Sequence, residues 1–289
     1  MMRDVICVAA ASSALRAVLA APARPAECLG VTRGALYLKI ARPPGVLVVL
    51  SHDAVRLPCG LVLATTSVEA PLTSLALAWA DPSAGFVVGD GEIRWAGPAG
   101  PVVVRAVREW APARPRQGPV TARALAAVRA SLSGADPGIR GVLLPDLGAA
   151  AADNDAATTA ATSLLGAGPG LTPSGDDVLT GFLAGAAAFG IDATALREAI
   201  AVLAPARTTA LSTALLWHAA RGECIDVLAG LAAALTSQPR GAEQAGLAVS
   251  RLLSVGHTSG AALALGLVTA AKTALRAQAV VAERQTSNL

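Results

Sequence analysis

Aromatic residues make up only 3% of this 289-residue chain, and charged residues only 15%. The net charge of +3 is small and dispersed, and no segment interleaves basic with aromatic side chains. Neither a nucleic-acid partner nor binding to an anionic membrane surface is therefore expected. The abundance of alanine, set against this shortage of large side chains, favours helices that pack closely through small residues.

The chain also lacks paired metal ligands of the zinc type. Its cysteines and histidines are scattered: Cys7, Cys28, Cys59, Cys224, His52, His218 and His257. They form no C-x-x-C pair and show no metal-ligand spacing, so neither a zinc site nor a disulfide framework is indicated. A reducing cytoplasm is the expected location.

No apolar run is typical of a membrane span, because residues 178–191 are too few and residues 252–271 are interrupted by polar groups. The apolar residues 5–11 do not form a convincing secretory signal, since Asp4 cancels the charge of Arg3. Residues 12–20 are predicted to form an amphipathic helix at the start of the first domain.

Residues 28–109 alternate between apolar and polar side chains and are punctuated by turns. Strands are expected at 35–40, 46–51, 60–66, 86–88, 92–96 and 102–105. Gly89-Asp90-Gly91 is a strong hairpin signal. Short strands without intervening helices predict an antiparallel, barrel-like sheet, and we assign residues 1–110 to this β-rich domain with its leading helix.

Residues 111–119 contain three prolines and are predicted to be a linker between two domains. Residues 120–289 have helical patterning throughout. Helices are expected at 120–132, 149–165, 193–203, 208–220, 225–235, 241–253 and 259–284, with a further apolar helix after residue 174. The sequence thus predicts the α+β class, a β-rich domain followed by an α-helical bundle.

The most informative stretch is the loop at residues 166–177, which leads directly into that apolar helix. It contains Gly168, Gly170, Thr172, Ser174, Gly175, Asp176 and Asp177. Thr172 and Ser174 suit the N-cap, so backbone N–H groups are expected to be free for an anion. The adjacent acids suit a site that also holds a cation, an amide or an ammonium group. The plain alternative is a capped helix whose acids complement the helix dipole.

A second loop resembles the first in kind, with glycine and hydroxyl groups before an apolar helix. It contains Gly256, His257, Thr258, Ser259 and Gly260. His257 adds a group that titrates near neutrality. A capping loop is the alternative here, but two such helix starts in one bundle predict that they line one cleft.

A third candidate segment contains Arg207, Thr208, Thr209 and Ser212. Arg207 is expected at a helix start, where an incoming carboxylate or phosphate would offset its unfavourable interaction with the dipole. Thr209 and Ser212 share one helix face and could line the same cleft. An exposed arginine that solvates a turn is the alternative.

Together these motifs resemble the AllH family, in the same order, over residues 156–270. They are Gly168-Pro-Gly-Leu-Thr-Pro-Ser-Gly-Asp-Asp177, Thr208-Thr209 with Ser212 and Ala220-Arg-Gly222, and Gly256-His-Thr-Ser-Gly260. In anaerobic allantoin breakdown, a part of purine degradation and nitrogen metabolism, the family member is a subunit of oxamate carbamoyltransferase that acts with two other proteins. The resemblance therefore implies partner subunits and a small anionic substrate such as carbamoyl phosphate or oxamate.

Under this resemblance the three segments would supply the substrate-binding groups: Gly168, Gly170, Thr172, Ser174, Gly175, Arg207, Thr208, Thr209, Ser212, Gly256, Thr258, Ser259 and Gly260. The catalytic candidates are Asp176, Asp177, His257 and Ser174. Asp176 or Asp177 would hold an amide –NH2 or a magnesium ion, which is the one cofactor that the sequence suggests.

Two other functions stay open at this stage. The chain could be a hydrolase of a small amide or phosphate substrate, either magnesium-dependent through Asp176 and Asp177 or serine-dependent through Ser174 with His257. It could also be a non-catalytic subunit that binds a small anion and presents it to a partner.

Overall fold

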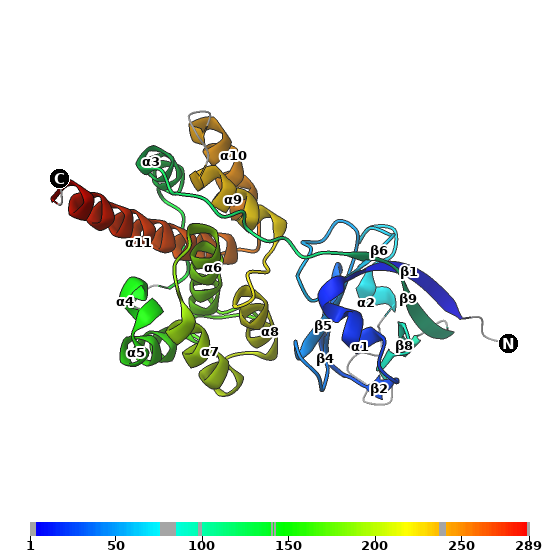
Figure 1. Ribbon diagram of the computed structural model, residues 1–289. Coiled ribbons are helices and arrows are strands. Elements are labelled where there is room, and N and C mark those ends of the chain that lie inside the picture. Colours follow the sequence, from blue (N-terminus) through cyan, green and yellow to red (C-terminus); the bar gives the residue numbers. More distant parts are fainter. Residues whose placement is uncertain are drawn as a thin grey trace. The chain divides into compact units, whose positions relative to one another are not determined.

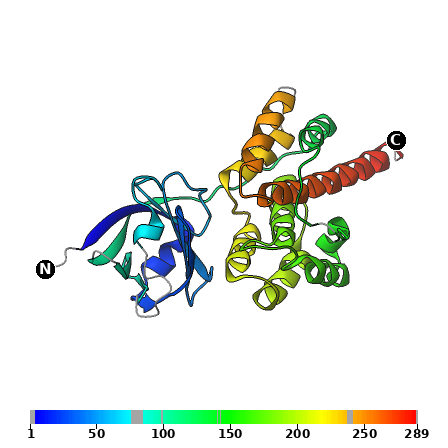
Figure 2. The same cartoon turned by 180° about the vertical axis from the view of Figure 1, so that it is seen from behind.

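The computed structural model describes residues 4–75, 85–97, 100–139, 141, 143–236 and 241–287. The chain forms two compact units, Met1–Pro112 and Ala113–Leu289, and the division falls within the proline-rich segment (Figure 1; Figure 2 shows the same chain from behind). The first unit is built around a sheet and the second from helices, which confirms the α+β class.

The sheet of the first unit is curled like a barrel. In the described residues its strands are β1 (Val5–Ser12), β2 (Arg24–Pro25), β3 (Glu27–Val31), β4 (Ala35–Lys39), β5 (Val46–Leu50), β6 (Gly60–Leu63), β7 (Val87–Gly89), β8 (Glu92–Gly97) and β9 (Gly100–Trp110). Their order is β2-β7-β8-β9-β1-β6-β5-β4-β3. Only Ala26 separates β2 from β3 in the chain, so the two ends of this order must approach each other.

Most strand pairs are antiparallel, as predicted, but β1 pairs with β9 in parallel and β5 pairs with β6 in parallel. The hairpin at Gly89-Asp90-Gly91 is present, with φ values of 51° at Asp90 and 81° at Gly91. Such positive φ values at both turn residues are typical of the type I′ turn that joins twisted strands.

The prediction for the start of the chain was partly wrong. Residues 5–12 form the central strand β1, and a short 3₁₀ turn (Ser13–Leu15) and α1 (Arg16–Leu19) replace the longer helix expected at residues 12–20. Ser12 accepts a hydrogen bond from the N–H of Ala14 and so starts the turn. One further short helix, α2, spans Leu72–Leu75.

The second unit contains the helices α3 (Ala122–Ser131), α4 (Leu147–Ala152), α5 (Asn154–Leu164), α6 (Ser174–Phe189), α7 (Thr194–Arg207), α8 (Ala210–Ala219), α9 (Asp226–Thr236), α10 (Gly241–Leu253) and α11 (Ser259–Ser287). The helix expected at 149–165 is divided because Asp153 is extended and caps α5 through the N–H of Ala156. The helix expected at 193–203 continues through Pro205 to Arg207. No helix among the described residues is long and apolar enough to cross a membrane.

Helix α6 is the centre of this unit, and Phe182 in its middle is completely buried. It crosses α11 at very short range (Figure 1). A methyl group on Gly181 would lie 2.1 Å from the carbonyl oxygen of Leu263, and one on Gly266 would lie 2.0 Å from the carbonyl oxygen of Val178. The contact is therefore reciprocal, and each helix offers a glycine to the backbone of the other.

We predict that Gly181→Ala destabilises the protein by roughly 1–3 kcal/mol or more, because the added methyl group forces α6 and α11 apart. Gly230→Ala on α9 is the matched control, since no atom lies within 4 Å of the added methyl group. There alanine should stabilise by about 0.5–1 kcal/mol. Urea unfolding followed by circular dichroism measures both, and equal effects of the two substitutions would contradict the close crossing.

Candidate functional site

The first two candidate loops meet, although about eighty residues separate them in the sequence. The hydroxyl oxygens of Thr172 and Ser259 are 3.2 Å apart, and those of Ser174 and Thr258 are 3.3 Å apart. Both pairs lie where α6 and α11 begin. The structure thus gathers four hydroxyl groups from the two loops at one place.

The two helices also begin in the same way. A methyl group on Gly175 would lie 2.0 Å from the carbonyl oxygen of Leu164, and one on Gly260 would lie 2.0 Å from that of Leu252. The preceding helices, α5 and α10, therefore end directly against the starts of α6 and α11. Gly175 and Gly260 are required by this packing, and their contact with a substrate stays a prediction.

Fewer backbone N–H groups are free at the start of α6 than the sequence suggested. Pro173, and neither Thr172 nor Ser174, occupies the N-cap position. Its carbonyl accepts the N–H groups of Asp176 and Asp177, at 2.9 and 3.2 Å, and the N–H of Gly175 donates to Ala167 at 2.8 Å. An anion would therefore depend on the hydroxyl groups of the loops more than on this helix start.

Asp176 is buried, and both of its carboxylate oxygens have partners. Oδ1 accepts the N–H of Gly166 at 2.9 Å, and Oδ2 accepts the hydroxyl of Thr208. Burial raises the pKa of Asp176, while the hydrogen bonds from Thr208 and Gly166 and the nearby Ser212 hydroxyl lower it. This acid ties the glycine-rich loop to the end of α7, which is a structural role.

Asp177 differs from its neighbour, because its Oδ2 is buried and has no hydrogen-bond partner among the described residues. Only 5% of the residue is exposed. The pKa of Asp177 is raised to about 7, mainly by burial and to a smaller extent by the charge of Asp176, while the hydroxyl groups of Ser259 and Thr172 act to lower it. A buried carboxyl with an open acceptor, next to two hydroxyl groups, is suited to a ligand that carries N–H donors.

The glycine-rich loop is exposed and has free space at Gly170. Gly168 and Gly170 have φ values of 106° and 99°, which other residues rarely adopt. Gly168 lies against the N–H of Ser174, whereas nothing lies within 4 Å of a methyl group placed on Gly170. Gly138 from the segment before α4 packs against Ser174 and Thr258 and covers the other side.

The third segment contributes through its hydroxyl groups. Thr209 caps α8 by accepting the N–H of Ser212 at 3.0 Å, and its own hydroxyl donates to the carbonyl of Leu171 at 2.6 Å. With Thr208 bonded to Asp176, this segment holds the first loop in place. The hydroxyl of Ser212 is buried and has no partner of ordinary hydrogen-bond geometry in the described part of the chain.

The predicted position of Arg207 at the start of a helix was wrong. Arg207 is the last residue of α7 rather than the first of a helix, so its charge is favourable to the helix dipole and needs no ligand. Its side chain is exposed and donates to the carbonyl of Thr162 at 3.3 Å. The sequence alone did not reveal that α7 continues through Pro205.

The structure does not bring Ser174 and His257 together as a catalytic pair. Ser174 is buried and bonded to Thr258, whereas His257 is exposed, as is Gly256 beside it. The geometry therefore does not support the serine hydrolase.

Magnesium fits the pair of acids poorly. Both oxygens of Asp176 are already occupied, which leaves Asp177 as the one carboxylate of the pair with an open oxygen. No group of three or more His, Cys, Asp or Glu side chains suited to a metal occurs among the described residues. Since magnesium usually takes one or two carboxylates together with water or phosphate oxygens, a site here would depend on Asp177 and on oxygens of the substrate.

Sequence reasoning missed a buried histidine. His218 on α8 is fully buried, its Nδ1 lies 2.7 Å from Oε2 of Glu223, and its Nε2 has no partner among the described residues. Glu223 also binds Arg114 at 2.7 Å. The two residues are five apart, a spacing that does not align on a helix, and they meet because the chain turns back after Ala219 at Gly222, whose φ is 74°.

We predict that Asp177→Asn changes the pH dependence of stability. The pKa of Asp177 is raised from 3.8 to about 7 on folding. Its stabilising contribution is therefore fully present below about pH 4 and is lost as the pH rises through about 7. Relative to wild type, the variant should gain roughly 2–3 kcal/mol between pH 5 and pH 8. Urea unfolding at several pH values measures this difference.

Asp155→Asn provides the control, because Asp155 is an exposed acid in the first turn of α5. It should show no comparable pH-dependent gain. Asp176→Asn provides the contrast, because the amide keeps one acceptor oxygen for the two donors of Gly166 and Thr208 and should therefore destabilise the protein. A difference between wild type and Asp177→Asn that does not vary with pH would contradict the raised pKa.

Comparison with known proteins gives a match over the segment that contains the two loops. Residues 164–271 match the model of a family described as "Oxamate carbamoyltransferase subunit AllH". No solved structure matches the chain. The matched residues run from the end of α5 into the middle of α11 and include both loops and the segment at Thr208. The segment that carries the candidate site is therefore similar to the AllH family, which confirms the resemblance predicted from the three motifs.

Proposed function

We propose that this chain is a subunit of a carbamoyltransferase and that Asp177 receives the –NH2 group of a small anionic substrate such as oxamate or carbamoyl phosphate. The observation that carries the proposal is the open, buried Oδ2 of Asp177 next to the hydroxyl groups of Thr172 and Ser259. The description of the matched family, which names a subunit of an oxamate carbamoyltransferase, supports the reaction class and the need for partner subunits.

The energetics of Asp177 favour a ligand with N–H donors. An ionised carboxylate that is buried without a hydrogen-bond partner destabilises the free protein. A ligand that donates an N–H group to this carboxylate removes the destabilisation, and this favours binding. Carbamoyl and amide groups carry such N–H donors, whereas inorganic phosphate has none. One hydroxyl group of the Thr172–Ser259 pair donates to the other, and the remaining hydroxyl hydrogen can donate to an oxygen of the same ligand.

The transfer itself requires one proton to move. The nitrogen of the acceptor amide forms a bond to the carbamoyl carbon, the bond between that carbon and the phosphate oxygen breaks, and the nitrogen loses one proton. Asp177, with a pKa of about 7, is suited to accept that proton and later to pass it to the departing phosphate. The amide is a weak nucleophile, so orienting it against the carbamoyl carbon contributes as much as the proton transfer.

We predict that Asp177→Asn lowers turnover by roughly 10²-fold in the complex with the partner subunits, because the variant can neither accept the proton nor bind the –NH2 group as a carboxylate. The assay follows phosphate release from carbamoyl phosphate with oxamate as acceptor. Asp155→Asn is the matched control and should keep wild-type turnover. Calorimetry with carbamoyl phosphate and with oxamate, each with and without magnesium, measures binding to the isolated chain.

Measuring the stability of Asp177→Asn together with its turnover distinguishes a catalytic acid from a structural one. A purely structural acid should lose stability when it is replaced, whereas Asp177→Asn is expected to gain stability at pH 8 while it loses turnover. Wild-type turnover in the variant would overturn the proposal for Asp177. Binding of neither compound to the isolated chain, together with wild-type turnover in the variant, would indicate that the substrate site lies on a partner subunit.

A further inference from the structure

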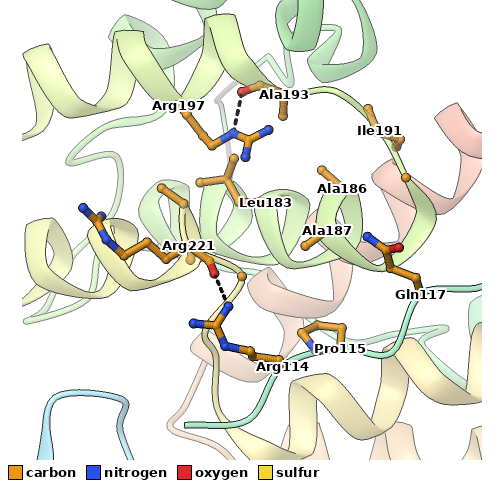
Figure 3. A pocket seen from close by; sticks show the side chains of 14 residues that line it. Arg114, Pro115, Gln117, Leu183, Ala186, Ala187, Ile191, Ala193, Arg197 and Arg221 are labelled. Atoms are coloured by element: carbon orange, nitrogen blue, oxygen red, sulfur yellow. Dashed lines mark hydrogen bonds between the residues drawn. The ribbon is translucent and has the colours of Figure 1, made fainter. Parts of the chain in front are cut away.

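A cavity of about 540 Å³ lies in the helical unit, away from the loops (Figure 3). Its apolar wall comes from α6 and from the start of α7, with Leu183, Ala186, Ala187 and Ala193 among the lining residues. From Asp177 to Leu183, the first residue of α6 that lines the cavity, the helix rises about 9 Å, and no residue of the two loops lines the cavity, so it is separate from the site at Asp177. The volume is in the range of cavities that bind small molecules.

The charged residues that line this cavity are arginines: Arg114, Arg197 and Arg221. No acidic side chain is among its lining residues. Figure 3 shows Arg197 and Arg114 on opposite sides of Leu183 and Ala187, with the amide of Gln117 at a third side. Arg221 contributes less, because its guanidinium group extends away from this wall and lies 3.5 Å from the ring centre of Trp217.

Arg197 has spare hydrogen-bonding capacity. Its Nε donates to the carbonyl of Ala193 at 3.2 Å, and its Nη2 lies 3.7 Å from Asp192, which is a loose ion pair. The same oxygen of Asp192 already accepts the N–H and the hydroxyl of Thr194, at 3.0 and 2.6 Å. Since a guanidinium group has five N–H donors, most of those of Arg197 can serve a ligand.

Arg114 is held in place by Glu223, which also binds the buried His218. Its Nη1 donates to the carbonyl of Arg221 at 2.9 Å, and its Nη2 donates to Glu223 at 2.7 Å. The other oxygen of Glu223 is bonded to His218 at 2.7 Å. His218 and Glu223 are thus positioning residues that fix the guanidinium group of Arg114 at the cavity, with donors to spare.

We infer that this cavity is a second anion-binding site, for a small organic acid whose carboxylate or phosphate group lies between Arg114 and Arg197. Two guanidinium groups on opposite sides of an apolar wall can bind an oxyanion with charge-assisted hydrogen bonds, while the alanines contact its uncharged part. The inference does not depend on the proposed carbamoyltransferase activity, because none of the residues at Asp177 takes part.

The test is calorimetric titration of the full chain with malonate, as a carboxylate probe, and with inorganic phosphate. Saturable binding of at least one probe is expected. Arg197→Gln should weaken it by about tenfold or more, since it removes the guanidinium group but keeps the length of the side chain. Arg129→Gln, on the exposed surface of α3 outside the cavity, is the charge-matched control and should bind like wild type.

Two further variants separate the possible outcomes. Binding should persist in Asp177→Asn, in which the first site is disabled, and Glu223→Gln should weaken it by releasing Arg114. Because Arg114 and Glu223 also link parts of the fold, their variants could lose binding through a change in structure. The result with Arg197→Gln therefore decides whether the cavity binds an anion. Absence of binding to wild type, or equal loss in Arg197→Gln and Arg129→Gln, would overturn the inference. Stronger binding of malonate than of phosphate would identify the ligand class as carboxylic acids, and the reverse as phosphates.

Discussion

The close crossing of α6 and α11 is the contact on which the helical unit depends. Each helix presses a backbone carbonyl into the space that a side chain would occupy on the other, at Gly181 and at Gly266. Because both glycines lie seven residues after the hydroxyl-bearing start of their helix, Ser174 or Ser259, one crossing brings both starts together. The contacts between Thr172 and Ser259 and between Ser174 and Thr258 follow from it.

The same crossing explains why two adjacent acids differ so much. Successive residues on a helix point about 100° apart, so Asp176 and Asp177 face different neighbours. Asp176 meets Gly166 and Thr208, which satisfy both of its oxygens. Asp177 lies near Thr172 and Ser259, whose hydroxyl groups also bond to each other, and its Oδ2 is left open. Burial is similar for both acids, so the difference between them lies in their hydrogen bonds.

Local chemistry was predictable from the sequence, and long-range geometry was not. The hydroxyl and glycine pattern correctly indicated two loops that begin helices, and alternating apolar residues indicated the sheet. The parallel pairing of β1 with β9 joins strands about a hundred residues apart and leaves no local signal. Arg207 was placed at the wrong end of a helix because a proline was taken to end α7. The pairing of His218 with Glu223 arises from a turn after α8 and has no helical spacing to predict it.

The buried helix α6 is rigid, and it can therefore position groups both at Asp177 and at the cavity between Arg114 and Arg197. From Val178 to Ala188 nearly every residue of α6 is buried, so the helix cannot shift without disturbing α11 and the rest of the core. Its first turn positions Asp177, and its last turns form the wall between Arg114 and Arg197. A ligand at either end would meet groups that are already in place, and little of its binding free energy would be spent on ordering the protein. The free energy that holds the open carboxyl of Asp177 in a buried position therefore comes from the same packing that preorganises the site.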